Sequence, residues 1–228
     1  MVEVSDVMVL DHLSKSYLKE GRKIKAVEDF STTLRPGEIN AVCGPSGCGK
    51  TSLLLLAGGL LSPDSGRVLA EGENISALNA NRKAQWRSRY CGFVFQQYHL
   101  VPYLTVYENI ISPELALGKT AGRRAEADQL CTDLGLNDRK HHFPGELSAG
   151  EKQRTALARA LYPGPKIILA DEITGNLDSR NARLVLDLLG EYRNRGGAVL
   201  MVTHDSSAAA EADRIISMEE GRIIHDGQ

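Results

Sequence analysis

The sequence predicts an α/β fold, in which a largely parallel β-sheet is covered by helices on both faces. Three short apolar segments, residues 39–43, 166–170 and 198–202, have the composition of buried strands. Segments with helical periodicity separate them, as expected for strands joined by crossover helices. A glycine-rich segment, residues 44–51, follows the first of these strands and leads directly into a helix. These features together predict one sheet with helices on both sides.

The other segments predict a smaller β unit before this sheet and a helical unit inserted into it. Residues 7–10 and 24–34 are strand-like and predict an N-terminal antiparallel β subdomain. Residues 91–95 and 214–218 predict two further strands. The first of these lies inside a mostly helical and more polar segment, about 79–136, and we expect an inserted α-helical subdomain over about 96–162.

Composition agrees with a single domain over residues 1–228, whose core covers about 1–95 and 163–228. The 42% hydrophobic and 25% charged residues exclude a disordered or collagenous chain. The longest apolar run, residues 52–61, is about half of the roughly 20 residues that a membrane-spanning helix needs. The N-terminus carries acidic residues where a secretion signal carries Lys or Arg, so we do not expect export.

Charge and cysteine content narrow the function further. The net charge of −2 disfavours non-specific nucleic-acid binding, which usually requires a strongly basic domain, and we expect no nucleic-acid partner. The four cysteines, at positions 43, 48, 91 and 131, form no CxxC pair, so neither a zinc site nor a disulfide framework is predicted. We expect four reduced thiols in a cytoplasmic protein.

The glycine-rich segment matches the GxxxxGK[ST] pattern of a phosphate-binding loop, in its expected place between a strand and a helix. Its glycines allow successive N–H groups to turn toward an anion, and the helix start adds unsatisfied N–H donors. Lys50 supplies a positive charge for the β- and γ-phosphates, and Thr51 a hydroxyl for Mg²⁺. The residues that we expect to bind nucleotide here are Gly44, Pro45, Ser46, Gly47, Cys48, Gly49, Lys50, Thr51 and Ser52.

An acidic pair follows the apolar strand over residues 166–170. Ligands of open α/β sheets bind at the carboxyl ends of the strands, where Asp171 and Glu172 stand. We expect Asp171 to hold Mg²⁺ through water, and Glu172 to orient and deprotonate the attacking water. The alternative is an acidic pair solvated in a loop. The two motifs together predict nucleotide binding, but they do not separate kinases, GTPases, helicases and transport ATPases.

Residues 147–154, LSAGEKQR, distinguish among these classes. Ser148 and Glu151 form a capping box, which predicts a helix start there. At this point the sequence resembles the ATP-binding cassette (ABC) family, whose signature is close to LSGGQ and precedes the acidic strand. The resemblance implies that Ser148 and Gly150 bind the γ-phosphate held by a second copy of the chain. Ala149 replaces the first signature glycine, and Glu151 the usual glutamine.

Four further residues match family landmarks in order. The resemblance implies that Gln96, with Gln97 as an alternative, senses Mg²⁺ and links to a membrane partner. Asp178, in Asn-Leu-Asp, matches the loop that crosses the dimer interface. His204 matches the histidine that contacts the γ-phosphate. Tyr17 takes the place of the aromatic residue that stacks on adenine, although a tyrosine after a strand is often a core or surface residue.

The resemblance covers nearly the whole chain and implies a P-loop NTPase (RecA-like) core that binds ATP and Mg²⁺. Residues 170–178, ADEITGNLD, resemble the branch that includes LolD-like, MacB-like and FtsE-like ATPases. Ile173 replaces the proline of that branch. The branch implies an ATP-dependent dimer and an integral membrane partner with four spanning helices and a large extracytoplasmic domain. The location implied is the cytoplasmic face of the inner membrane.

Several functions remain open at this stage. The first is the ATPase of a membrane export or extraction complex of the type VII (MacB-like) kind, and the second is an FtsE-like mechanotransmission ATPase that transports nothing. A soluble ABC ATPase of DNA repair or translation is less well supported, because no coiled-coil insertion or zinc cysteines are present in the sequence. A P-loop kinase or GTPase does not account for the signature or for His204.

Overall fold

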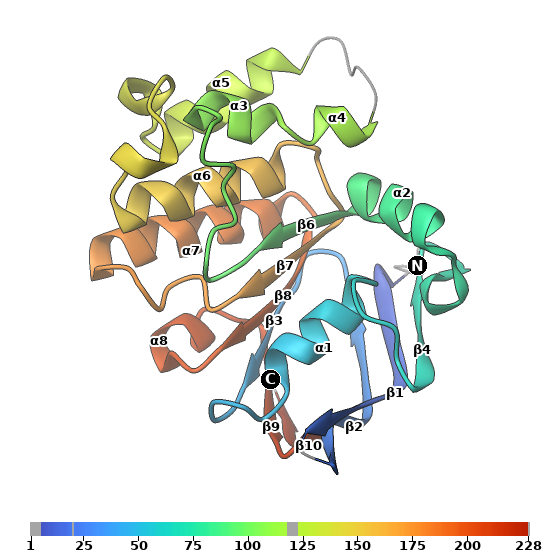
Figure 1. The fold of residues 1–228 in the computed structure, drawn as a ribbon. Coiled ribbons are helices and arrows are strands. Elements are labelled where there is room, and N and C mark those ends of the chain that lie inside the picture. Colours follow the sequence, from blue (N-terminus) through green and yellow to red (C-terminus); the bar gives the residue numbers. More distant parts are fainter. Residues whose placement is uncertain (1–5, 20, 118–122, 228) are drawn as a thin grey trace, which may run out of the picture.

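The computed structural model describes residues 6–19, 21–117 and 123–227. Residues 1–5, on which the expectation about export partly depends, lie outside this range. Within the described segments, no helix combines the length and the apolar character that crossing a membrane requires. The chain folds into two β-sheets with helices between and around them (Figure 1).

The larger sheet has six strands in the order β10-β9-β3-β8-β7-β6. The strands from β9 to β6 are parallel to one another, and β10 pairs with β9 antiparallel. This confirms the predicted parallel sheet. The three inner strands β3, β8 and β7 are almost entirely buried, which explains their mostly apolar sequences. The six strands are β3 (Ile39–Cys43), β6 (Cys91–Val94), β7 (Ile167–Asp171), β8 (Ala198–Thr203), β9 (Arg214–Glu219) and β10 (Arg222–Gly227).

The smaller sheet is antiparallel and has the order β2-β1-β4-β5. Its strands are β1 (Met8–Lys19), β2 (Arg22–Leu34), β4 (Ser65–Ala70) and β5 (Glu73–Asn74). The first two strands are longer than the sequence pattern predicts. Irregular register interrupts their pairing, and His12 and Asp29 adopt left-handed backbone angles there, so the alternation of side chains is broken within each strand.

Helices separate the two sheets and cover the outer face of the larger one (Figure 1). The helix α1 (Lys50–Ala57) packs between the sheets, whereas α6 (Ala149–Leu161) and α7 (Ser179–Asn194) lie on the opposite face of the larger sheet. The other helices are α2 (Ala80–Tyr90), α3 (Val106–Ile111), α4 (Glu114–Leu117), α5 (Arg124–Asp133) and α8 (Ser206–Ala209). Three short 3₁₀ turns lie at Ile75–Ala77, Asn137–Arg139 and Pro144–Glu146.

Each inner strand of the larger sheet contributes to two hydrophobic cores. Val42 and Leu200 point toward α1 and the smaller sheet. Their chain neighbours Ala41 and Val199 point to the other side, where α6 and α7 pack. Because successive side chains of a strand face opposite ways, an apolar strand is stable only when both faces are covered. This arrangement leaves the carboxyl ends of β3, β7 and β8 at one edge of the sheet, which positions the loops described next.

Candidate nucleotide-binding site

The glycine-rich loop connects β3 to α1 in a conformation that requires glycine at two positions. Gly49, the residue before α1, has φ 109°, and a Cβ placed on it would lie 1.8 Å from the carbonyl oxygen of Ala26. Gly47 has φ 82° and open space around it. The left-handed backbone at both positions is adopted readily only by glycine. The loop therefore turns back over the start of α1, whose first N–H groups are available to an anion.

Lys50 is buried and folds back onto this loop. Its Nζ donates to the carbonyl oxygens of Gly44 and Pro45, at 2.7 and 3.0 Å, and its exposed fraction is 7%. A charged ammonium group at this depth must be compensated by hydrogen bonds or by an anion. The lysine charge is thus held inside the loop, next to the place where phosphates would lie.

Thr51 and Asp171 meet across the gap between α1 and the end of β7. The Thr51 hydroxyl donates to the Asp171 carboxylate, with oxygen separations of 3.1 and 3.4 Å. Burial raises the pKa of Asp171, and the neighbouring Glu172 carboxylate raises it further. The hydrogen bond from Thr51 and the charge of Lys50 lower this pKa, but burial outweighs them. A hydroxyl and a carboxylate side by side are the oxygen donors that Mg²⁺ takes from proteins when phosphates supply the other ligands, so this pair fits the ion.

Glu172 and His204 form a second polar pair beside the first. Glu172 follows the last residue of β7 and has a left-handed backbone with φ 50°, which is uncommon for a residue other than glycine. Its Oε2 lies 2.7 Å from Nδ1 of His204, which follows β8. The Glu172 side chain is 13% exposed, whereas that of His204 is 63% exposed. The strained turn thus holds a carboxylate at the sheet edge, as functional residues often require.

These side chains line one cavity of about 580 Å³. The tyrosine ring of Tyr17 reaches it from β1, and its hydroxyl lies 3.3 Å from Oγ of Ser52 on α1. Gln96 reaches it from the segment after β6. The predicted residues that line the cavity are Tyr17, Ser46, Gly47, Gly49, Lys50, Thr51, Ser52, Gln96, Asp171, Glu172 and His204. Ile24 and Ala26 of β2 also line it, and sequence reasoning did not identify them.

The cavity does not include the other predicted residues. Gly44, Pro45 and Cys48 belong to the loop but do not line the cavity, and Cys48 is 6% exposed within the core next to α1. Ser148 and Asp178 are exposed caps at the starts of α6 and α7. Gly150 is buried, and a Cβ on it would lie within 3.0 Å of the Asn181 side chain. Ser148, Gly150 and Asp178 are therefore not brought to the cavity of their own chain.

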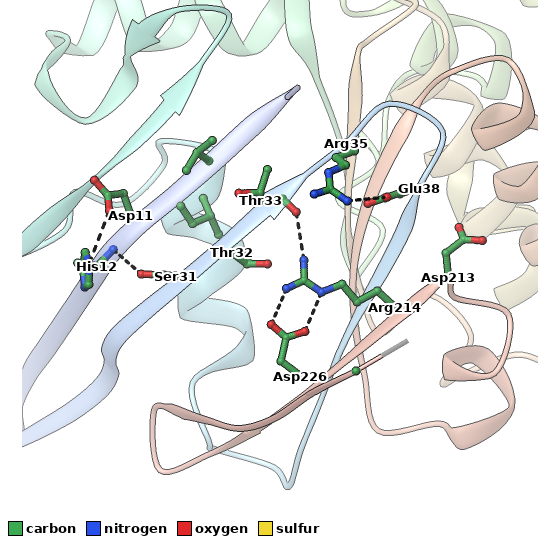
Figure 2. Close-up of a pocket in the computed structure, with 13 residues that line it drawn as sticks. Asp11, His12, Ser31, Thr32, Thr33, Arg35, Glu38, Asp213, Arg214 and Asp226 are labelled. Carbon is green, nitrogen blue, oxygen red and sulfur yellow. Dashed lines mark hydrogen bonds and ion pairs between the residues drawn. The ribbon is translucent and has the colours of Figure 1, made fainter. Parts of the chain in front are cut away.

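A larger cavity, about 700 Å³, lies elsewhere, between the smaller sheet and the starts of β3 and β9 (Figure 2). Its charged groups are paired within the chain. Arg214 holds both carboxylate oxygens of Asp226 and also donates to the carbonyl of Thr33, and Arg35 lies 3.7 Å from Glu38 (Figure 2). It shares none of the phosphate-loop residues, so we assign nucleotide binding to the smaller cavity.

The parallel sheet, the loop and the acidic pair define a P-loop nucleotide-binding protein. Comparison with known proteins places the chain more closely: the family model described as ABC transporter matches residues 27–175, so the chain belongs to the ABC transporter family as an ATP-binding domain and ATPase. The lipoprotein-releasing system ATP-binding protein LolD 1 of Rhodopirellula baltica is 41% identical, over 97% of this chain and 98% of that protein.

Other relatives are longer or have known structures. The macrolide export ATP-binding/permease protein MacB 2 of Aeromonas hydrophila is 39% identical over 95% of this chain, which spans 34% of that protein. A dimeric ATP-binding cassette in a post-hydrolysis state, bound to ADP and Pi, is 33% identical with a TM-score of 0.91, over 97% of this chain and 98% of that one. A second dimeric cassette structure is also 33% identical, with a TM-score of 0.92. The two cassette structures confirm the predicted fold class, a P-loop NTPase core of the ABC type.

Proposed function

We propose that this chain is the ATP-hydrolysing subunit of a membrane export or extraction complex of the type VII (MacB-like) kind. The observation that carries the proposal is the convergence of Lys50, Thr51, Asp171, Glu172 and His204 on one cavity at the carboxyl edge of the sheet. A cation, a hydroxyl–carboxylate pair and a second carboxylate within one cavity are the groups that ATP hydrolysis requires. The full-length similarity to LolD 1 supports the same assignment.

Each group has a distinct role in the proposed reaction. Lys50 and the loop N–H groups would bind the phosphates, Thr51 and Asp171 would hold Mg²⁺, and Gln96 would sense the ion. When bound, Mg²⁺ neutralises charge on the phosphates. Glu172 accepts a proton from water while the water oxygen bonds to the γ-phosphorus. The bond from that phosphorus to the bridging oxygen breaks, and ADP leaves with the electron pair. His204, held by Glu172, contacts the γ-phosphate.

A second copy of the chain completes the site. Ser148 and Gly150 start α6 and Asp178 caps α7, and all three lie outside the cavity of their own chain. We propose that they face the nucleotide bound by the partner copy, so that two ATP molecules hold two chains together. The dimeric cassette structures at 33% identity support this arrangement. Hydrolysis removes the γ-phosphate contact, and the dimer opens.

The helical subdomain, which we propose to cover about residues 96–162, transmits this motion to an integral membrane subunit with four spanning helices and a large extracytoplasmic domain. The chain would then lie at the cytoplasmic face of the membrane through that subunit. LolD 1, which matches over its full length, is named as part of a lipoprotein-releasing system, and MacB 2 as an export ATP-binding/permease protein. We therefore favour release or export over mechanotransmission.

Purification of tagged Glu172→Gln chain from solubilised membranes, with MgATP present, tests this proposal. The expected result is a co-purifying membrane protein with four spanning helices and a large external domain. A parallel purification without nucleotide is the control for non-specific recovery. A partner whose external domain binds a cell-wall enzyme and no cargo would favour mechanotransmission instead. Recovery of a soluble dimer alone would contradict the membrane role.

A further inference from the structure

The start of α6 carries a carboxylate at the place where a phosphate is proposed to bind. The Ser148 hydroxyl donates to Glu151 Oε2 at 2.9 Å, and the Ser148 backbone N–H donates to the same oxygen at 2.8 Å. In return, the Glu151 N–H donates to the Ser148 oxygen at 3.3 Å. A hydroxyl has a single hydrogen to donate. In this arrangement that hydrogen is engaged by the chain's own carboxylate.

Arg139 binds the other oxygen of this carboxylate. Its Nε donates to Glu151 Oε1 at 2.7 Å, from the turn Asn137–Arg139 that precedes α6. The Glu151 side chain is 17% exposed and that of Arg139 is 43% exposed. Burial alone would raise the pKa of Glu151, but hydrogen bonds from Arg139 and Ser148 outweigh it and lower the pKa to about 2. Glu151 is therefore an anion at neutral pH.

An anion beside Ser148 opposes the approach of a phosphate, because like charges a few ångströms apart repel strongly near a protein surface. Among the described residues, Arg139 is the cation within 4.0 Å of Glu151. The neighbouring Lys140 does not pair with Glu151, because its Nζ forms an ion pair with Asp128 at 2.6 Å. Because Arg139 and the Ser148 N–H also bind the carboxylate, Glu151 keeps these two hydrogen bonds when the Ser148 hydroxyl turns toward another acceptor.

We propose that Arg139 is a positioning residue of the ATP-bound dimer. Its ion pair with Glu151 compensates the charge of that carboxylate, and this allows Ser148 to donate to the γ-phosphate held by the partner copy. The inference rests on the proposed ATP-bound dimer and assigns Arg139 a role in it. It also explains how a glutamate serves where the usual signature has a neutral glutamine.

The test measures ATP-dependent dimerisation by sedimentation velocity in a Glu172→Gln background with MgATP. Arg139→Ala should raise the dimer dissociation constant at least tenfold. Adding Glu151→Gln to Arg139→Ala should return the dimer dissociation constant to within about threefold of that of the Glu172→Gln chain, because a neutral side chain needs no counter-charge. Lys140→Ala, which removes a comparable ion pair next in the chain, should change it less than twofold. Binding of a fluorescent ATP analogue to dilute monomers should be unchanged in all variants.

The outcomes separate this inference from the proposed function. Arg139→Ala dimers as tight as the background, or weakened dimers that Glu151→Gln does not restore, would overturn the role of Arg139 while leaving the dimer in place. A background protein that forms no ATP-dependent dimer would overturn both proposals. Glu151→Gln alone tests the same charge with Arg139 retained: it should dimerise at least as tightly as the background, and a tenfold loss would contradict the inference.

Discussion

Replacing Gly49 by alanine tests how the phosphate loop is built. Two costs combine at this position. The backbone has φ 109°, and a non-glycine residue with a left-handed backbone costs about 1–2 kcal/mol. In addition, a Cβ would lie 1.8 Å from the Ala26 carbonyl oxygen and 2.9 Å from its carbon. Real Cβ atoms do not approach a backbone oxygen this closely, so β2 or the loop must move, at an overpacking cost of about 1–3 kcal/mol.

The neighbouring glycine provides a matched control. Gly47 also has a left-handed backbone, at φ 82°, but no heavy atom lies within 4 Å of a Cβ placed on it. Gly47→Ala should therefore cost only about 1–2 kcal/mol, part of which is recovered because alanine reduces the freedom of the unfolded chain by about 0.4–1 kcal/mol. Gly49→Ala should lower the free energy of unfolding by about 2–4 kcal/mol in total, a large fraction of the roughly 5–15 kcal/mol that stabilises a typical domain.

Urea unfolding followed by circular dichroism measures both variants against the parent chain. We expect the free energy of unfolding to fall more for Gly49→Ala than for Gly47→Ala by at least about 1 kcal/mol. A fluorescent ATP analogue should report a larger loss of affinity for Gly49→Ala, because the displaced loop no longer presents its N–H groups. Equal destabilisation of the two variants would show that contact with Ala26 does not shape the loop.

Three other predictions follow from buried or paired groups. Cys48 is enclosed in the core next to α1, so N-ethylmaleimide should modify it slowly. Once modified, the chain should lose nucleotide binding. Unchanged nucleotide binding, after mass spectrometry has shown that Cys48 is fully modified, would contradict this prediction. Glu151 has a folded pKa of about 2 against an ordinary 4.5, so it stabilises the fold above about pH 4.5 and this contribution is lost as the pH falls toward 2. The stability difference between parent and Glu151→Gln, measured by urea unfolding, should shrink accordingly, and a constant difference would refute it. Arg159 donates hydrogen bonds to the carbonyls of Tyr98 and His99. Arg159→Ala should therefore lower the free energy of unfolding by about 2–3 kcal/mol. A change below about 0.5 kcal/mol would show that these hydrogen bonds do not stabilise the fold.

The sequence predicts the parts of this fold that local chemistry determines. The buried strands β3, β7 and β8 are mostly apolar because both of their faces are covered. The glycine pattern of the loop follows from its backbone, and Ser148 and Glu151 form the capping box that their spacing indicates. Glu172 was predictable because it directly follows the apolar strand β7, at the sheet edge where ligands bind. His204, which follows β8 and lines the same cavity, was predicted from the family resemblance alone.

Features that depend on tertiary packing were not predicted. β4 and β10 were missed because much of each strand is exposed, so no long apolar run marks them. β5 was missed because it consists of only two polar residues. Ile24 and Ala26 line the cavity because the smaller sheet packs over α1, a contact that no spacing along the chain indicates. The Arg139–Glu151 ion pair likewise depends on tertiary packing, which brings the turn Asn137–Arg139 against the start of α6.

The most direct test of the account is to compare ATP binding and ATP hydrolysis in the parent chain and in Glu172→Gln. The substitution keeps the size of the side chain but removes the carboxylate that we assign as general base. We predict that ATP affinity is retained and that turnover falls by about 100-fold or more, the range expected for loss of a general base. Hydrolysis at the parental rate would contradict the assignment of Glu172 and, with it, the proposed chemistry of this cavity.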